Sequence, residues 1–170
     1  NLDKSLIYTP DKSIEALAFY WKADIARQKG DYAGSNQWIT KFLSQAVSVS
    51  SEHSSKVSAG TAYYIQGYNN FKQKEYLPAQ ITFEKAVDRL KEEKDPSIKQ
   101  AVYPDALARL ADCYYIRKDF KEAKIIYTRI IQENLKGADY ATYQKAILDG
   151  LSGNYAGKIE GLKSVQKSYP

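Results

Sequence analysis

The chain has 170 residues, enough for one domain with a sizeable core or for a short array of repeats. Its 25 Lys and Arg residues are interleaved with 20 Asp and Glu residues, so the net charge of +5 favours a mixed, solvated surface over a patch for nucleic acid or an anionic membrane. A single cysteine excludes an internal disulfide framework and a cysteine-based metal cluster, and no apolar run is long enough for direct membrane insertion.

Apolar residues at helical spacing predict eight helices in four antiparallel pairs, over residues 14–43, 56–94, 102–136 and 139–169. In each pair a short polar turn precedes an aromatic residue, and small residues lie nine and fourteen positions before that aromatic. The aromatic residues are Tyr32, Tyr76, Phe120 and Tyr155, and the small residues are Ala18, Ala23, Ala62, Gly67, Ala106, Ala111, Ala141 and Ala146. Because small residues let two helices approach closely, this register predicts packed helical hairpins.

A second apolar stripe follows each aromatic at helical spacing and predicts the packed side of the second helix of each pair. The stripe residues are Ile39, Phe42, Ala79, Phe83, Ala86, Ala123, Tyr127, Ile130, Ile159, Leu162 and Val165. Two longer connections, the serine-rich segment 48–55 and the charged segment 91–96, are expected between pairs.

This pattern resembles the tetratricopeptide repeat (TPR), a helix-turn-helix unit of 34 residues, and residues 104–137 match its motif almost throughout. The resemblance implies an all-α fold, a right-handed α-solenoid of about four repeats near 14–47, 58–94, 104–137 and 139–170. It further implies a single domain over 1–170 that is part of a longer repeat array. The style of the repeats resembles bacterial cell-envelope TPR proteins, which implies the periplasm or cell envelope, with the cytoplasm as the alternative.

In the family that the chain resembles, the first helix of each repeat lines a concave groove that binds a peptide or protein partner. Carried over to this sequence, the groove positions are Tyr20, Asp24, Arg27, Tyr64, Tyr68, Phe71, Asp112, Tyr115, Tyr140 and Tyr143. Tyrosine offers large contact area and a hydroxyl group, which suits an interface anchor. The alternative is that several of these rings pack between neighbouring helices. Some family members clamp a chaperone's terminal carboxylate with Lys, Asn and Arg at fixed groove places, and here those places hold tyrosine, aspartate or alanine, so binding of a chaperone tail is not expected.

The function expected is therefore a non-enzymatic scaffold that binds a protein or peptide partner and assembles a larger complex. A structural spacer or accessory domain of a longer multi-domain protein is the alternative, and RNA binding through Lys and Tyr is a third reading. Neither the partner's identity nor the oligomeric state follows from the sequence.

The sequence predicts no catalytic residue, no cofactor and no metal. His53 is a lone histidine in the serine-rich segment, and catalysis needs a base that other groups hold in place. Cys113 is expected to be a small buried residue, and Asp105 and Asp112 are expected on a solvated helix surface. Trp21 and Trp38 are expected to pack between helices.

Overall fold

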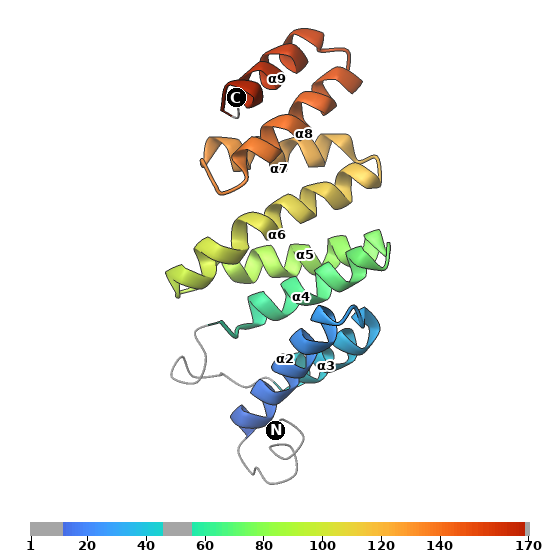
Figure 1. Ribbon diagram of the computed structural model, residues 1–170, viewed down its shortest axis with the longest axis vertical. Coiled ribbons are helices and arrows are strands. Elements are labelled where there is room, and N and C mark those ends of the chain that lie inside the picture. The colour runs from blue at the N-terminus through green and yellow to red at the C-terminus, as the bar shows by residue number, and fades with distance from the viewer. Residues whose placement is uncertain (1–11, 46–55, 169–170) are drawn as a thin grey trace. The chain divides into compact units, whose positions relative to one another are not determined.

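The computed structural model describes residues 12–45 and 56–168, and these residues form eight α-helices and no strand (Figure 1). The helices are α2 (Lys12–Gln28), α3 (Tyr32–Ser44), α4 (Ala59–Lys72), α5 (Tyr76–Lys91), α6 (Pro96–Ile116), α7 (Phe120–Gln132), α8 (Ala138–Leu151) and α9 (Tyr155–Ser168). The expectation of an all-α fold is confirmed. Within the described ranges no helix is long and apolar enough to cross a membrane. The expectations for the segment 48–55 and for His53 lie outside the described residues.

The chain forms two compact units, which divide within α6 between Tyr103 and Pro104. The first unit holds the pairs α2–α3 and α4–α5 and the beginning of α6. The second unit holds the rest of α6 with α7, followed by the pair α8–α9. A single domain over 1–170 stays a prediction.

All four pairs use the same tight turn between their helices. A residue with a left-handed backbone stands two positions before each second helix; these residues are Gly30 (φ 80°), Lys74 (φ 63°), Lys118 (φ 67°) and Gly153 (φ 82°). The next amide along the chain then donates to a carbonyl five residues back, as in Asp119 N to Tyr114 O at 2.9 Å. This bond closes the C-terminus of the first helix and sends the chain back along it.

The small residues let the helices of a pair pack closely, as the sequence predicts. All seven alanines of that set are buried, and Gly67 is buried with them. A Cβ atom on Gly67 would come within 2.8 Å of the Phe83 ring, so glycine is required for the contact between α4 and α5. One stripe residue departs from the prediction: Ile159 on α9 is exposed, because no described helix of the second unit packs over its side of α9.

Aromatic stacking joins α2 to α3. The ring of Trp38 stacks on Phe19 with the centroids 5.8 Å apart. The ammonium groups of Lys22 and Lys41 lie 4.2 and 4.6 Å from the centroid of the Trp38 ring, a favourable cation–π arrangement. Trp38 therefore packs between helices, as expected.

Polar side chains join α3 to α4 in the first unit. Asn36 Nδ2 donates to Asn70 Oδ1 at 2.7 Å, and Asn69 Nδ2 donates to Ser35 Oγ at 2.8 Å and to Asn36 Oδ1 at 2.9 Å. Both partners in each bond are neutral, and Ser35, Asn69 and Asn70 are buried. These bonds occupy the buried amide nitrogen of Asn69 and fix the register of the two helices, while Asn69 Oδ1 is buried without a hydrogen-bond partner among the described residues.

Charged side chains join α7 to α8 in the second unit. The carboxylate of Asp149 is only 1% exposed and receives Lys124 Nζ at 2.5 Å and Lys145 Nζ at 2.8 Å. Desolvation by itself would raise the pKa of Asp149, but the hydrogen bonds and positive charges of the two lysines outweigh it, so the net shift of the pKa is downward.

A pocket between α2, α4 and α6

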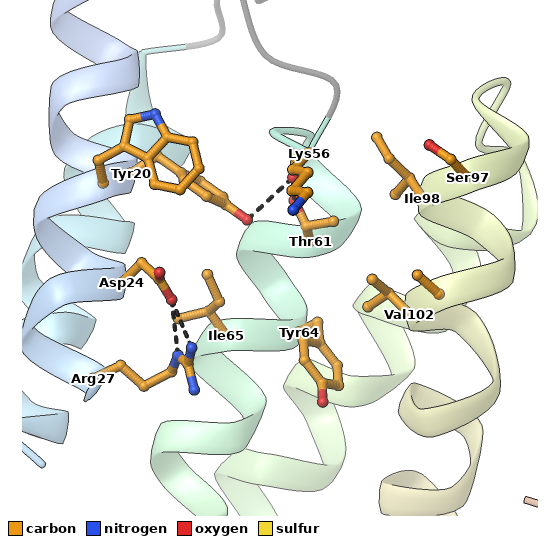
Figure 2. A pocket seen from close by; sticks show the side chains of 12 residues that line it. Tyr20, Asp24, Arg27, Lys56, Thr61, Tyr64, Ile65, Ser97, Ile98 and Val102 are labelled. Carbon is orange, nitrogen blue, oxygen red and sulfur yellow. Dashed lines mark hydrogen bonds and ion pairs between the residues drawn. The ribbon is translucent and has the colours of Figure 1, made fainter.

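The first unit contains a pocket of about 500 Å³, which we call the first-unit pocket (Figure 2). Its lining comes from the first helices of successive pairs and from the residues just before α4. The lining residues are Tyr20, Trp21, Asp24 and Arg27 from α2, Lys56, Thr61, Tyr64 and Ile65 from the α4 region, and Ser97, Ile98, Ala101 and Val102 from α6. It is therefore mainly aromatic and aliphatic, with one ion pair and a few hydroxyl groups, which is the usual composition of a binding site.

Helical spacing brings the α2 residues of the pocket to one face. Tyr20, Asp24 and Arg27 are four and three residues apart, so they lie on the same side of α2. Arg27 Nη2 pairs with Asp24 Oδ1 at 2.6 Å, and the Arg27 guanidinium lies 5.7 Å from the centroid of the Tyr68 ring. Gln28 Nε2 also donates to Asp24 Oδ2, at 2.7 Å. Asp24 and Arg27 thus form a polar edge of the pocket, and the predicted position Tyr68 contacts Arg27 from outside the lining.

Tyr20 is a structural wall of the pocket. Its ring is buried against Phe42, with the centroids 5.4 Å apart, and its hydroxyl donates to the carbonyl of Lys56 at 3.3 Å. Burial raises the pKa of Tyr20 to about 12, so the hydroxyl stays protonated at neutral pH. The ring of Tyr20 therefore packs between helices, which is the alternative that the sequence analysis gives for the groove tyrosines.

Trp21 and Tyr64 offer aromatic surface to the pocket. Trp21 is 36% exposed, so the expectation that it packs between helices is wrong; its ring lies nearly perpendicular to that of Tyr20, with the centroids 5.6 Å apart. Tyr64 is half-buried beside Phe83, and Figure 2 shows it reaching from α4 toward Val102 on α6. Sequence reasoning missed Trp21 because it stands beside a groove position and not on one.

Phe71, like Tyr68, is a predicted first-unit position that lies outside the pocket lining. It lies at the last turn of α4, where its ring packs edge-on against Tyr76, with the centroids 5.5 Å apart. This contact holds the turn between α4 and α5.

In the second unit, Asp112 belongs to a buried cluster, so the expectation of a solvated position is wrong. Its carboxylate is 6% exposed; Oδ1 accepts from the hydroxyls of Tyr127 at 2.6 Å and Tyr140 at 2.8 Å, and Oδ2 accepts from Arg109 at 2.8 Å. Asp105, half-buried, pairs with the same Arg109 at 3.3 Å. The cluster joins three helices, because Asp112 on α6 accepts hydrogen bonds from Tyr127 on α7 and Tyr140 on α8.

The two tyrosines of this cluster stay protonated. Desolvation and the negative charge of Asp112 raise the pKa of Tyr140 to about 12 and raise that of Tyr127 further. Tyr140 also accepts from Gln144 Nε2 at 2.9 Å. Tyr140 and Asp112 are thus hydrogen-bonded to each other, and this leaves their polar atoms less available to a partner.

The remaining predicted positions of the second unit are more open. Tyr115 is half-buried, and its ring lies 5.7 Å from that of Phe120. Tyr143 on α8 is exposed. Cys113 is fully buried, as expected. Within the residues that the structure describes, no group of three or more His, Cys, Asp or Glu side chains could hold a metal ion.

No model of a protein family and no curated protein sequence matches the chain. Solved structures do match. MamA aligns with a TM-score of 0.73 at 18% identity, over 98% of this chain and 83% of MamA. The apo form of RapI aligns with a TM-score of 0.76 at 14% identity, over 96% of this chain but only 59% of RapI. BtubC (BKLC) from P. vanneervenii aligns with a TM-score of 0.76 at 10% identity, over 98% of this chain and 69% of BtubC.

At these identities the likeness shows the fold alone. The fold is the helical-repeat fold of TPR structures, so the expected fold class is confirmed. The resemblance to cell-envelope members of the family stays a prediction.

Proposed function

We propose that this chain is a non-enzymatic protein-interaction scaffold that binds a peptide segment of a partner in the first-unit pocket. The observation that carries the proposal is the pocket itself, which brings together four of the sequence-predicted positions, Tyr20, Asp24, Arg27 and Tyr64. TPR-fold neighbours agree with a scaffold role, and the pocket supplies the place where a partner would be held.

The lining of the pocket suits an apolar or aromatic side chain as the anchor of the bound peptide. Trp21 supplies exposed aromatic surface and the half-buried Tyr64 adds to it, and the half-buried Val102 on α6 adds aliphatic surface. The Asp24–Arg27 pair lies at the polar edge, where it can hydrogen-bond to polar groups of the peptide. The two charges remain paired with each other, so binding leaves neither of them buried without a partner. Buried aromatic anchors with a polar rim are the usual source of affinity in such interfaces.

Selection of a displayed peptide library on the full chain tests the proposal. The affinity of each selected peptide is then measured by calorimetry for the chain and for Trp21→Ala and Tyr64→Ala. We expect each substitution to weaken binding roughly tenfold or more, as for aromatic hot spots. The matched control is Ile81→Ala on α5, which removes an equally exposed apolar side chain outside the pocket.

Peptides that bind all variants equally would place recognition on another surface. Failure to select any peptide would favour the spacer or accessory-domain reading. Circular dichroism must show unchanged helicity for each variant, because Tyr64 also packs near Phe83. The periplasmic or cell-envelope location, with assembly of a larger complex there, is part of the proposal and is tested by fractionation of the source cells.

A further inference from the structure

The polar edge of the first-unit pocket offers hydrogen-bond donors to a ligand. Asp24 holds the Arg27 guanidinium: its Oδ1 accepts from Arg27 Nε at 3.1 Å and from Nη2 at 2.6 Å, and its Oδ2 accepts from Gln28 at 2.7 Å. Each carboxylate oxygen of Asp24 is therefore occupied. Arg27 Nη1 donates to none of the described residues, and the Arg27 side chain is 31% exposed. A ligand group that reaches this edge must therefore be a hydrogen-bond acceptor.

The same edge carries more positive than negative charge. Two cations lie against the ring of Tyr68: the Arg27 guanidinium is 5.7 Å and the Lys72 ammonium is 5.3 Å from its centroid. Contact with the ring stabilises each cation but leaves its charge in place. Asp24 pairs with Arg27, and no described carboxylate pairs with Lys72. One further carboxylate would balance the charge of this edge.

The distance from the pocket lining to the charged edge sets the spacing within a bound peptide. Tyr64 lines the pocket, and Tyr68 stands four residues further along α4, which is about 6 Å along the helix axis. An extended peptide advances about 3.3 Å per residue. A peptide that runs along α4 with its anchor beside Tyr64 therefore reaches the charged edge two residues from that anchor.

We infer that the first-unit pocket selects acidic peptide segments, in which an apolar or aromatic anchor enters the lining and an Asp or Glu side chain two residues away binds Arg27. Lys72 balances the added negative charge. Asp24 is a positioning residue, because it holds the guanidinium and leaves Nη1 for the ligand. The inference rests on the proposed function, since it names the kind of peptide that the pocket binds.

The probes that test it are displayed peptides with one fixed tryptophan as the anchor. Two positions before or after the tryptophan they carry Glu, Gln or Lys, and the other positions are random. We expect the full chain to retain mainly Glu peptides at an ionic strength of about 0.05 M, where surface charges are weakly screened. Retained peptides are then synthesised with both ends blocked, so that no terminal charge contributes.

Calorimetry on these synthetic peptides measures the preference for the acidic residue. Replacing the Glu by Gln should weaken binding roughly tenfold, and replacing it by Lys should weaken binding further, because the cations then repel the peptide. The ratio between the Glu and Gln peptides should fall toward one at an ionic strength of about 0.5 M.

Three variants of the chain locate the acidic residue. Arg27→Gln should reduce the roughly tenfold preference for Glu over Gln to about threefold or less, and Lys72→Gln should reduce it by about twofold or more. The matched control is Lys56→Gln, which removes the same charge at the opposite end of the pocket (Figure 2) and should leave the preference unchanged. Because the preference is a ratio of two affinities for one variant, a general loss of affinity does not alter it.

The exposed Lys72 decides the test if Arg27→Gln alters the circular dichroism. Equal binding of the Glu and Gln peptides, combined with loss of binding in Trp21→Ala and Tyr64→Ala, would overturn the inference and leave the proposed function standing. A preference that Lys56→Gln abolishes and Arg27→Gln keeps would overturn the inference as well. Failure to retain any peptide, from these probes or from the unrestricted library, would overturn both.

Discussion

The two units join successive helix pairs with the same positions but with side chains of different chemistry. Asn36 and Lys124 each stand four residues after the aromatic that opens the second helix of a pair. Asn70 and Asp149 each stand six residues before the aromatic of the following pair. In the first unit this place holds a hydrogen bond between neutral amides, and in the second unit it holds an ammonium–carboxylate pair.

The same backbone geometry therefore accepts either a neutral amide pair or an ion pair, and the stability of the two differs in its dependence on pH. The amide pair has no charge to lose and does not depend on pH. The carboxylate of Asp149 is stable in its buried place only while it is ionised and flanked by Lys124 and Lys145. The second unit should therefore be the part of the chain that responds to acid and to the loss of a charged partner.

The largest expected effect comes from removing both cations of the second unit. Lys124→Met with Lys145→Met strands the buried carboxylate and should reduce the free energy of unfolding by about 3 to 5 kcal/mol, the usual cost of breaking a buried pair. Urea unfolding followed by circular dichroism measures it. The control Arg129→Met breaks an exposed pair with Glu133 and should cost less than about 1 kcal/mol. Equal costs for the two variants would contradict the comparison.

A smaller effect is expected at the amide pair of the first unit. Asn36→Ala removes the donor to Asn70 and the acceptor for Asn69, so it should reduce the free energy of unfolding by about 1 to 3 kcal/mol. The loss should be the same at pH 7 and pH 4, because both partners are neutral. Urea unfolding at the two pH values measures it, and a loss that depends on pH would argue against a purely neutral junction.

Acid should destabilise the second unit before the first. The loss in its free energy of unfolding should be smaller than in the double lysine variant, because a protonated carboxyl still makes hydrogen bonds. The pKa of Asp149 is lower in the folded chain than the unfolded value of about 3.9. The unfolded state therefore takes up the proton first as the pH falls, and the stability that Asp149 contributes is lost between the unfolded and the folded pKa. Hydrogen exchange of α8 and α4, corrected for intrinsic rates, measures the difference.

A variant that copies the first unit sharpens this test. Lys124→Asn with Asp149→Asn places two amides where the first unit has Asn36 and Asn70. Its α8 amides should lose the acid sensitivity of the parent chain. An unchanged acid response of α8 would assign the sensitivity to another titratable group of the second unit.

The smallest expected effect lies in the turns, where the two units are alike. Lys74 and Lys118 adopt the left-handed conformation that Gly30 and Gly153 adopt in the other pairs. Lys118→Gly and Lys74→Gly should each raise the free energy of unfolding by about 0.5 to 1 kcal/mol, since glycine has no Cβ penalty there. Thermal unfolding checks both. A loss of stability at either turn would mean that the lysine side chain makes a compensating contact.

Much of the fold could be predicted from the sequence because it depends on local spacing. Small residues such as Ala23 and Gly67, and the aromatic after each turn, recur at fixed positions, and periodicity detects such a pattern. The predicted helix pairs match the helices of the described residues within a few positions at most of their ends.

The site was harder to predict because burial of a polar residue depends on partners from other helices. Asp112 has the spacing of a surface residue, but its partners Tyr127 and Tyr140 lie 15 and 28 positions further along. Asp149 likewise needs Lys124 from the preceding helix. No single-helix pattern carries that information. Trp21 and Ile159 were misjudged for the converse reason, since apolar residues at helical spacing are expected to be covered and these two are not.

Both tryptophans of the chain, Trp21 and Trp38, stand in its first helix pair. Tryptophan fluorescence, excited at a wavelength that tyrosine does not absorb, therefore reports on that pair alone. The second unit contributes nothing to this signal. Denaturation midpoints that coincide for tryptophan emission and far-ultraviolet circular dichroism would mean that the pairs melt as one cooperative body. Separate midpoints would mean that the chain contains two folding bodies, each with its own transition.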